Sequence, residues 1–146
     1  MPITDTQVAA LRAQLAGHIE EHERLLDQLD SAADNEGYAT LVAMAFLEAV
    51  ERRFGERPPN KAEVVEFVGN MRSRSDNVRQ RLSAEVAEQA IMTVYDQASL
   101  DDLDDKTVQY AQVIITVALI SDEQLADDGL DAFMAEVRSV AEQVLA

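Results

Sequence analysis

Apolar residues recur at the spacing of an α-helix through nearly the whole chain. The clearest stripe lies near the C-terminus and comprises Leu130, Phe133, Met134, Val137, Val140 and Val144. Residues three and four positions apart lie on one face of a helix. Only three prolines and five glycines interrupt the 146 residues, so the helices are expected to be long. The sequence therefore predicts an all-α protein.

Six helical segments are expected along the chain. The first two lie at about residues 6–30 and 37–54. The third begins at residue 61 and its pattern fades at 73, and the fourth begins at 83. The fifth lies at about 104–120, a single turn is expected at 122–125, and the sixth follows residue 128. Thr4 with Gln7, and Asn60 with Glu63, form capping patterns in which a side chain bonds the first free backbone N–H groups of a helix. Gly55 is suited to ending the second segment.

The second and fifth segments, about residues 37–54 and 104–120, are apolar nearly all round. Helices of this kind are typical of the centre of a bundle. We therefore expect a single helical domain over residues 1–146, with two central helices surrounded by four amphipathic ones. Residues 113–117 also have high β propensity, but a strand needs partners that the rest of the chain does not supply.

The chain is strongly acidic, with 28 acidic and 12 basic residues and a net charge of −16. Such a surface repels nucleic acids and anionic membranes, so we expect no general binding of either. The longest apolar run, Val113–Ile120, is too short to span a bilayer. No secretory signal is visible and cysteine is absent, so a cytoplasmic location is predicted. Because only two of the basic residues are lysine, the acidity also fits salt adaptation.

The two histidines, His18 and His22, are one helical turn apart. Spacing of four residues places both imidazoles on one helix face, as a metal site requires, and Glu21 is a candidate third ligand. The string matches the H-x-x-E-H pattern of the inverzincin peptidases, but those enzymes need a distant third ligand on a larger fold. Both histidines also fall in a seven-residue leucine seam. We therefore weigh two interpretations. One is a divalent-metal or pH-responsive site completed by a carboxylate from another helix or a second subunit. The other is a pair of partly buried imidazoles hydrogen-bonded to acidic neighbours or to the backbone.

A basic segment contains Arg72, Arg74, Arg79 and Arg81. Residues 61–82 carry five bases and three acids, whereas residues 101–146 carry eleven acids and two bases. Arginine clusters recognise phosphate and carboxylate groups through two parallel hydrogen bonds. Contact with a partner or an anion is one interpretation of this segment. Internal pairing with the acidic helices is the other.

Signatures of most enzyme classes are missing. The five glycines are isolated, so there is no phosphate-binding loop or dinucleotide fingerprint. The aspartates from Asp101 onward lack the glycine and glutamate of a calcium loop. We therefore expect a non-enzymatic interaction or regulatory module without a cofactor that binds a protein partner, which the charge suggests is basic. A metal or small-ligand sensor at His18 and His22, and an immunity-like or DNA-mimicking inhibitor, are the alternatives. The leucine stripes also leave a homodimer open.

Overall fold

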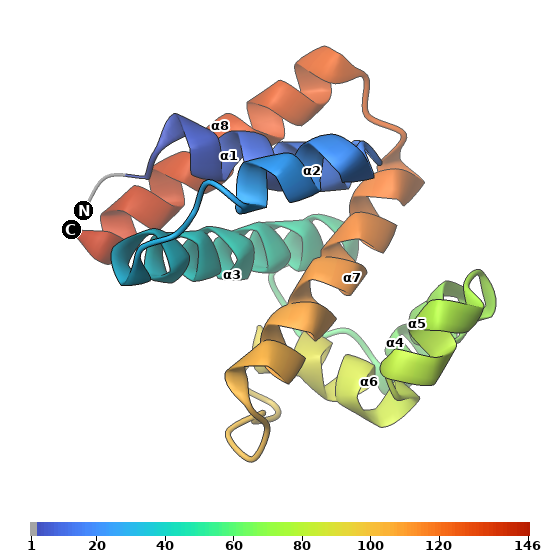
Figure 1. The fold of residues 1–146 in the computed structure, drawn as a ribbon. Helices are drawn as coiled ribbons and strands as arrows, with labels where there is room; N and C mark the ends of the chain where they lie inside the picture. The colour runs from blue at the N-terminus through green and yellow to red at the C-terminus, as the bar shows by residue number, and fades with distance from the viewer. Residues whose placement is uncertain (1–2) are drawn as a thin grey trace.

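The computed structural model describes residues 3–146, which form eight α-helices and no strand over that range (Figure 1). The all-α prediction is confirmed, whereas the expected number of six helices is wrong. The helices are α1 (Asp5–Leu15), α2 (Ile19–Leu26), α3 (Ala32–Phe54), α4 (Lys61–Ser73), α5 (Asp76–Arg81), α6 (Ala84–Thr93), α7 (Asp105–Glu123) and α8 (Asp127–Leu145).

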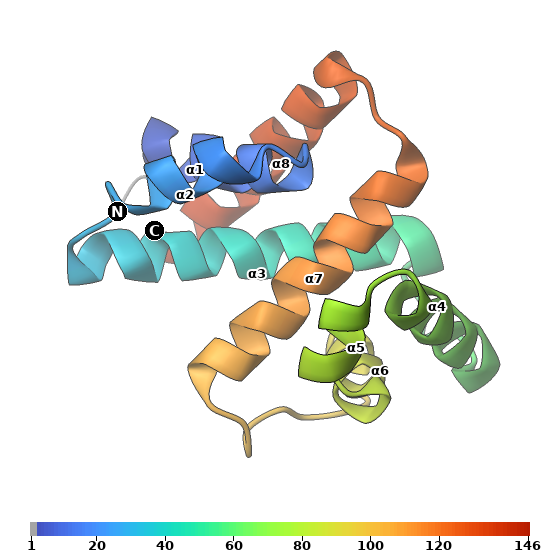
Figure 2. The same ribbon diagram turned by 45° about the vertical axis from the view of Figure 1, so that its right-hand side comes forward.

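The expected first helix is two helices, because the chain turns at Gly17. Gly17 has a φ of +82°, in the left-handed region that favours glycine. The turn is closed by the Gly17 and His18 N–H groups, which donate to the carbonyls of Gln14 (3.1 Å) and Ala13 (2.8 Å). After it, α2 runs back along α1 (Figures 1 and 2). The prediction of one continuous helix over residues 6–30 is therefore wrong.

The second additional helix, α5, lies in the basic segment. The Ser75 hydroxyl oxygen caps it by accepting a hydrogen bond from the Val78 N–H (3.3 Å). Farther along, α7 continues to Glu123 and stops at Gln124, whose φ is +52°. The expected separate turn at residues 122–125 is thus mostly the end of α7. Residues 113–117 lie within α7 as well, so they are helical and not a strand.

Helix α3 lies across the centre of one half of the molecule and packs against α1, α7 and α8. It begins at Ala32, earlier than the expected Gly37, because the Ser31 hydroxyl oxygen accepts a hydrogen bond from the Asp34 N–H (3.0 Å). Helix α7 also packs against α1 and α6. Their shared core includes fully buried side chains from these helices, among them Leu41, Val42, Val50, Ile115, Leu119, Phe133 and Met134.

Helices α4, α5 and α6 form a second group, which packs against α7 chiefly through α6 (Figure 2). The two ends of the described chain lie close together in both views. Arginines join helices that are far apart in sequence: Arg138 contacts Asp5 at 2.8 Å, and Arg52 contacts Glu123 at 2.5 Å. Among residues 3–146, no helix combines the length and apolarity needed to cross a membrane.

Both predicted capping patterns are present. The Thr4 hydroxyl accepts from the Gln7 N–H (3.2 Å), while the Gln7 side-chain oxygen accepts from the Thr4 N–H (2.7 Å). Asn60 caps α4 in the same way by accepting from the Glu63 N–H (2.9 Å). Gln7 is only 2% exposed. Its side-chain amide also donates to the Asp34 carbonyl (2.8 Å), which connects the start of α1 to α3.

Candidate functional site

His22 lies in α2 and is buried against α1. Its Nδ1 atom is 2.7 Å from the carbonyl oxygen of Ala10, and the residue is 7% exposed. A carbonyl oxygen only accepts hydrogen bonds, so Nδ1 carries the proton in this contact. The turn between α1 and α2 makes this hydrogen bond possible, because it brings α2 back beside Ala10 on α1. One nitrogen of His22 is therefore already engaged within the protein.

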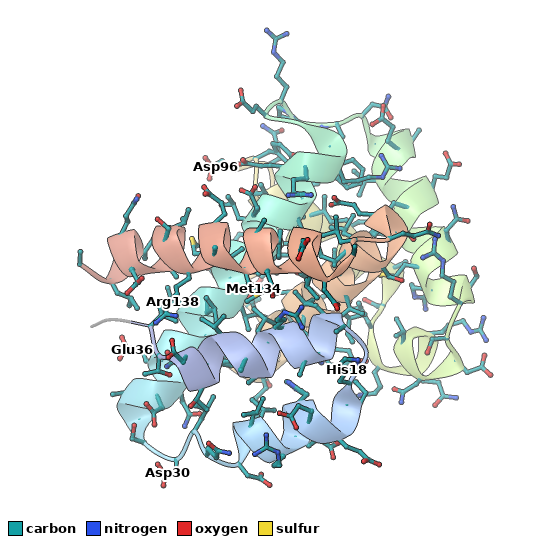
Figure 3. The ribbon with its side chains drawn as sticks, turned by 90° about the horizontal axis from the view of Figure 1, so that it is seen from above. His18, Asp30, Glu36, Asp96, Met134 and Arg138 are labelled. Atoms are coloured by element: carbon teal, nitrogen blue, oxygen red, sulfur yellow. The ribbon has the colours of Figure 1, made fainter. Side chains whose placement is uncertain are left out.

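His18 lies outside the helix that carries His22. It is the N-terminal capping residue of α2, with a ψ of 74° that is not helical, and it is exposed. Figure 3 places it at the end of α1 and α2 where the turn lies. It lines a small hollow of about 200 Å³ together with Gln124, Leu125 and Asp127 at the α7–α8 turn. The expectation that both imidazoles lie in one leucine seam is therefore wrong for His18.

Glu21, the candidate third ligand, is engaged with Arg24. Its two carboxylate oxygens accept hydrogen bonds of 3.1 Å and 2.5 Å from Arg24, and this contact lowers the pKa of the Glu21 carboxyl. Among residues 3–146, no group of three or more histidine, acidic or cysteine side chains is arranged to hold a metal ion. Coordination by His18 and His22 stays a prediction, and it requires a ligand from elsewhere or a rearrangement of the turn.

The four arginines of the basic segment divide into two places. Arg74 contacts the Asp122 carboxylate on α7 (2.7 Å) and lines a hollow that also contains Glu63 and Glu66. Arg72, Arg79 and Arg81 instead line a different hollow, between α5 and the starts of α6 and α7. The predicted internal pairing with an acidic helix is therefore present for Arg74, and Arg79 also has a carboxylate partner, Asp76, on its own helix. Arg72, Arg79 and Arg81 form a separate constellation, which the sequence did not distinguish from Arg74.

Acidic side chains gather on α2 and at the start of α3. Residues 20–36 contain seven acids and one base, Arg24. Six of the seven are exposed and Asp34 is partly exposed. Asp30 and Glu36 lie at the outer edge of this region in Figure 3. Because α2 packs chiefly against α1, its opposite face, which carries Glu20, Glu21 and Glu23, remains open to solvent.

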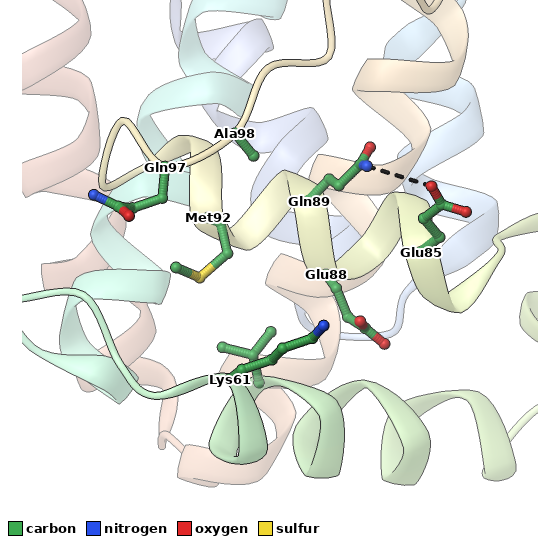
Figure 4. Close-up of a pocket in the computed structure, with 8 residues that line it drawn as sticks. Lys61, Glu85, Glu88, Gln89, Met92, Gln97 and Ala98 are labelled. Carbon is green, nitrogen blue, oxygen red and sulfur yellow. Dashed lines mark hydrogen bonds between the residues drawn. The ribbon is translucent and has the colours of Figure 1, made fainter.

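A groove of about 570 Å³ lies between α4 and α6 (Figure 4). Val64, Met92 and Ala98 form the apolar part of its lining. Its remaining lining is polar: Lys61, Glu85, Glu88, Gln89 and Gln97. The Gln89 side-chain amide donates to Glu85 at 3.5 Å. The lining contains neither a histidine nor a hydroxyl group.

Comparisons with known proteins add no functional assignment. No family model matches the sequence, and no curated protein or solved structure matches the chain. The features that bear on function are therefore the charges, hollows and contacts of the molecule itself.

Proposed function

We propose that the protein is a non-enzymatic interaction module that presents the acidic surface of α2 and the start of α3 to a basic protein partner. The single observation behind the proposal is that this surface carries several carboxylates that form no ion pair with any cation among residues 3–146. We call it the α2 acidic surface and define it by Glu20, Glu23, Asp27, Asp30, Asp34 and Glu36.

The distribution of ion pairs supports the choice of this surface. Among residues 3–146, ion pairs engage eight of the 28 carboxylate side chains, which leaves 20 without one. No member of the α2 acidic surface has an ion pair within the described chain. Arg24, the one base between Glu20 and Glu36, is already paired with Glu21. The local negative charge is therefore not neutralised by the protein's own cations.

Unpaired carboxylates on an exposed face act mainly through long-range attraction. They raise the association rate with an oppositely charged partner, and salt weakens this effect over a screening length of about 8–10 Å. Because these side chains are solvated in the free protein, their contribution to affinity is modest for each residue and depends on their number. A partner is thus expected to bind through several arginine or lysine side chains at once, with strong salt dependence.

Two variants of equal net charge test the proposal. One neutralises the α2 acidic surface with Glu20→Gln, Glu23→Gln, Asp27→Asn and Asp30→Asn. The control neutralises four exposed and unpaired acids elsewhere: Asp101→Asn, Asp102→Asn, Asp128→Asn and Glu136→Gln. Proteins captured from the native host at low salt by the wild type are identified by mass spectrometry, and their binding rates to all three proteins are measured over a range of salt concentrations.

We expect the α2 variant to slow association with the captured partner, and the control variant to keep most of the wild-type rate. The partner's association rate should also fall as salt increases. Equal effects of the two variants would show that only the total charge matters, which contradicts a dedicated surface. A captured partner whose association is insensitive to salt would equally contradict the proposal. Circular dichroism of each variant verifies that it remains helical.

A further inference from the structure

Three arginines converge on one hollow of about 310 Å³ in a protein whose net charge is −16. Arg72 comes from the last turn of α4, whereas Arg79 and Arg81 come from α5. The rest of the lining is uncharged and consists of Gln80, Leu82, Ser83, Val86 and Thr107. The hollow therefore concentrates positive charge, and no carboxylate is part of its lining.

Arg72 is held in place by backbone carbonyl groups. Its Nε atom donates to the Leu82 carbonyl (2.9 Å), and one Nη atom donates to the Arg79 carbonyl (3.1 Å). These contacts fix the plane of the guanidinium group without neutralising it, because a carbonyl carries no net charge. The second Nη atom makes no hydrogen bond within the described chain. Arg72 is thus oriented in advance and still carries its full charge and free donors.

Arg81 is held by an aromatic ring. Its guanidinium carbon lies 4.2 Å from the centroid of the Tyr110 ring on α7. A cation over a ring face is attracted by the ring electrons, and the N–H groups at the edge of the guanidinium stay available. Arg79 does have a carboxylate partner, Asp76. The Asp76 side chain is 82% exposed, so solvent screens that pair and an incoming anion can compete for Arg79.

We propose that this hollow binds a small oxyanion ligand, a molecule that presents a phosphoryl or carboxylate group. Guanidinium groups recognise such groups through paired, charge-assisted hydrogen bonds. The Ser83 hydroxyl accepts from the Val86 N–H (3.1 Å), which leaves its own hydrogen to donate. The volume lies at the lower end of small-molecule sites. It therefore suits a small phosphorylated or acidic metabolite better than a large cofactor.

Arg74 provides a matched control within the same segment. It carries the same charge, but Asp122 neutralises it at 2.7 Å and acidic side chains surround it. Loss of Arg81 should therefore affect the anion strongly, whereas loss of Arg74 changes only the total charge. Because the whole protein repels anions, weak binding over the general surface is suppressed, and saturable binding reports a local site.

Isothermal titration calorimetry in a low-salt zwitterionic buffer tests the proposal with three probes: inorganic phosphate, pyrophosphate and citrate. We expect at least one probe to saturate a single site on the wild-type protein. Arg81→Gln should weaken that binding by about tenfold or more, the amount expected for a lost charge-assisted hydrogen bond. Arg74→Gln should change it by less than about twofold, as expected for an already paired surface charge. Tighter binding of phosphate probes than of citrate identifies the phosphoryl group, and the reverse identifies a carboxylate.

Two outcomes would overturn the proposal. The first is the absence of saturable binding for all three probes at millimolar concentration. The second is an equal loss in Arg74→Gln and Arg81→Gln, which would reduce the effect to general charge. Arg81→Gln is preferred to a change at Arg72, whose carbonyl contacts also hold α5 in place. Neither outcome bears on the α2 acidic surface, so this proposal and the proposed function fail separately.

Discussion

Removing the hydroxyl group of Tyr38 should not destabilise the protein and is expected to stabilise it. Tyr38 lies on α3, is 6% exposed, and its hydroxyl oxygen is fully buried without a hydrogen-bond partner among residues 3–146. Burying a hydroxyl without a partner costs about 1–3 kcal/mol relative to water. Tyr38→Phe removes that cost and leaves a void of only one oxygen atom. We expect the free energy of unfolding to rise by about 1 kcal/mol.

Tyr95 offers the same chemical deletion in the opposite situation. Its hydroxyl donates to the Gly55 carbonyl at 2.7 Å, and this bond joins the chain after α6 to the end of α3. Tyr95→Phe loses that bond, so we expect it to destabilise the protein by about 0.5–1.5 kcal/mol. The two variants should therefore differ by about 2 kcal/mol, which combines these two estimates. For a protein of this size, that corresponds to roughly 4–8 °C in Tm.

Urea unfolding followed by far-UV circular dichroism measures both changes, since the helical signal does not depend on a tyrosine fluorophore. The slope against urea should be the same for both variants and the wild type, because the surface exposed on unfolding hardly changes. The reasoning would be refuted if Tyr38→Phe destabilised the protein as much as Tyr95→Phe. That result would show that the Tyr38 hydroxyl has a partner in solution, such as an ordered water molecule.

Alkaline pH provides a second readout of Tyr38. Burial raises the pKa of its hydroxyl above the ordinary value of 10.0. The unfolded chain therefore loses this proton at a lower pH than the folded protein, and stability falls as pH rises above about 10. Tyr38→Phe should make this decline shallower. Urea midpoints measured below and above pH 10 check the difference in slope.

Three further predictions concern glycines and histidines. Gly17→Ala should destabilise the protein by about 1–2 kcal/mol, because the positive φ of this residue is strained for any side chain. Gly69→Ala lies within α4 and has no atom within 4 Å of an added Cβ, so it should stabilise the protein by up to about 1 kcal/mol. Urea unfolding shows whether the two changes in stability have opposite signs. A Cβ at Gly37 would lie 2.6 Å from the Gln7 side-chain nitrogen, so Gly37→Ala should destabilise the wild type, yet stabilise a Gln7→Ala protein by about 0.5–1 kcal/mol. If Gly37→Ala destabilised the Gln7→Ala protein as well as the wild type, the close approach of Gln7 to Gly37 would be contradicted. Zinc coordination by the two histidines predicts stoichiometric heat in calorimetry that is lost when either is replaced by alanine, and no heat at about 10–100 μM zinc would end that hypothesis.

Local signals in the sequence predicted much of the helical structure. The caps at Thr4 and Asn60 and the stop at Gly55 depend on residues a few positions apart, and the structure has all three. Gly17 was the informative residue that the apolar pattern concealed. The seven-residue leucine spacing continues across it, although the chain reverses there. A periodic pattern indicates which residues of a helix are buried, but it does not distinguish one continuous helix from two helices joined by a turn.

The same limit explains the two histidines. Their separation of four residues implied one helix face only if a single helix contained both. With the turn at Gly17, His22 is buried against Ala10 and His18 is exposed beside the α7–α8 turn. No signal within residues 18–22 distinguishes these outcomes, because the second contact comes from residues more than a hundred positions away. The one signal in the sequence that could have indicated the end of a helix was Gly17, near the middle of the long apolar stripe.

The arginines show why net charge alone does not locate a binding surface. Arg74 and Arg81 are chemically identical, but Asp122 neutralises one and the Tyr110 ring supports the other. The first partner removes charge from the surface, whereas the second fixes a cation in place and leaves its charge intact. Only the packing of α7 against its neighbours decides which arginine receives which partner. A protein with a net charge of −16 can thereby contain one hollow with the opposite sign, and exposed acids such as Asp30 remain free to meet a cation from outside.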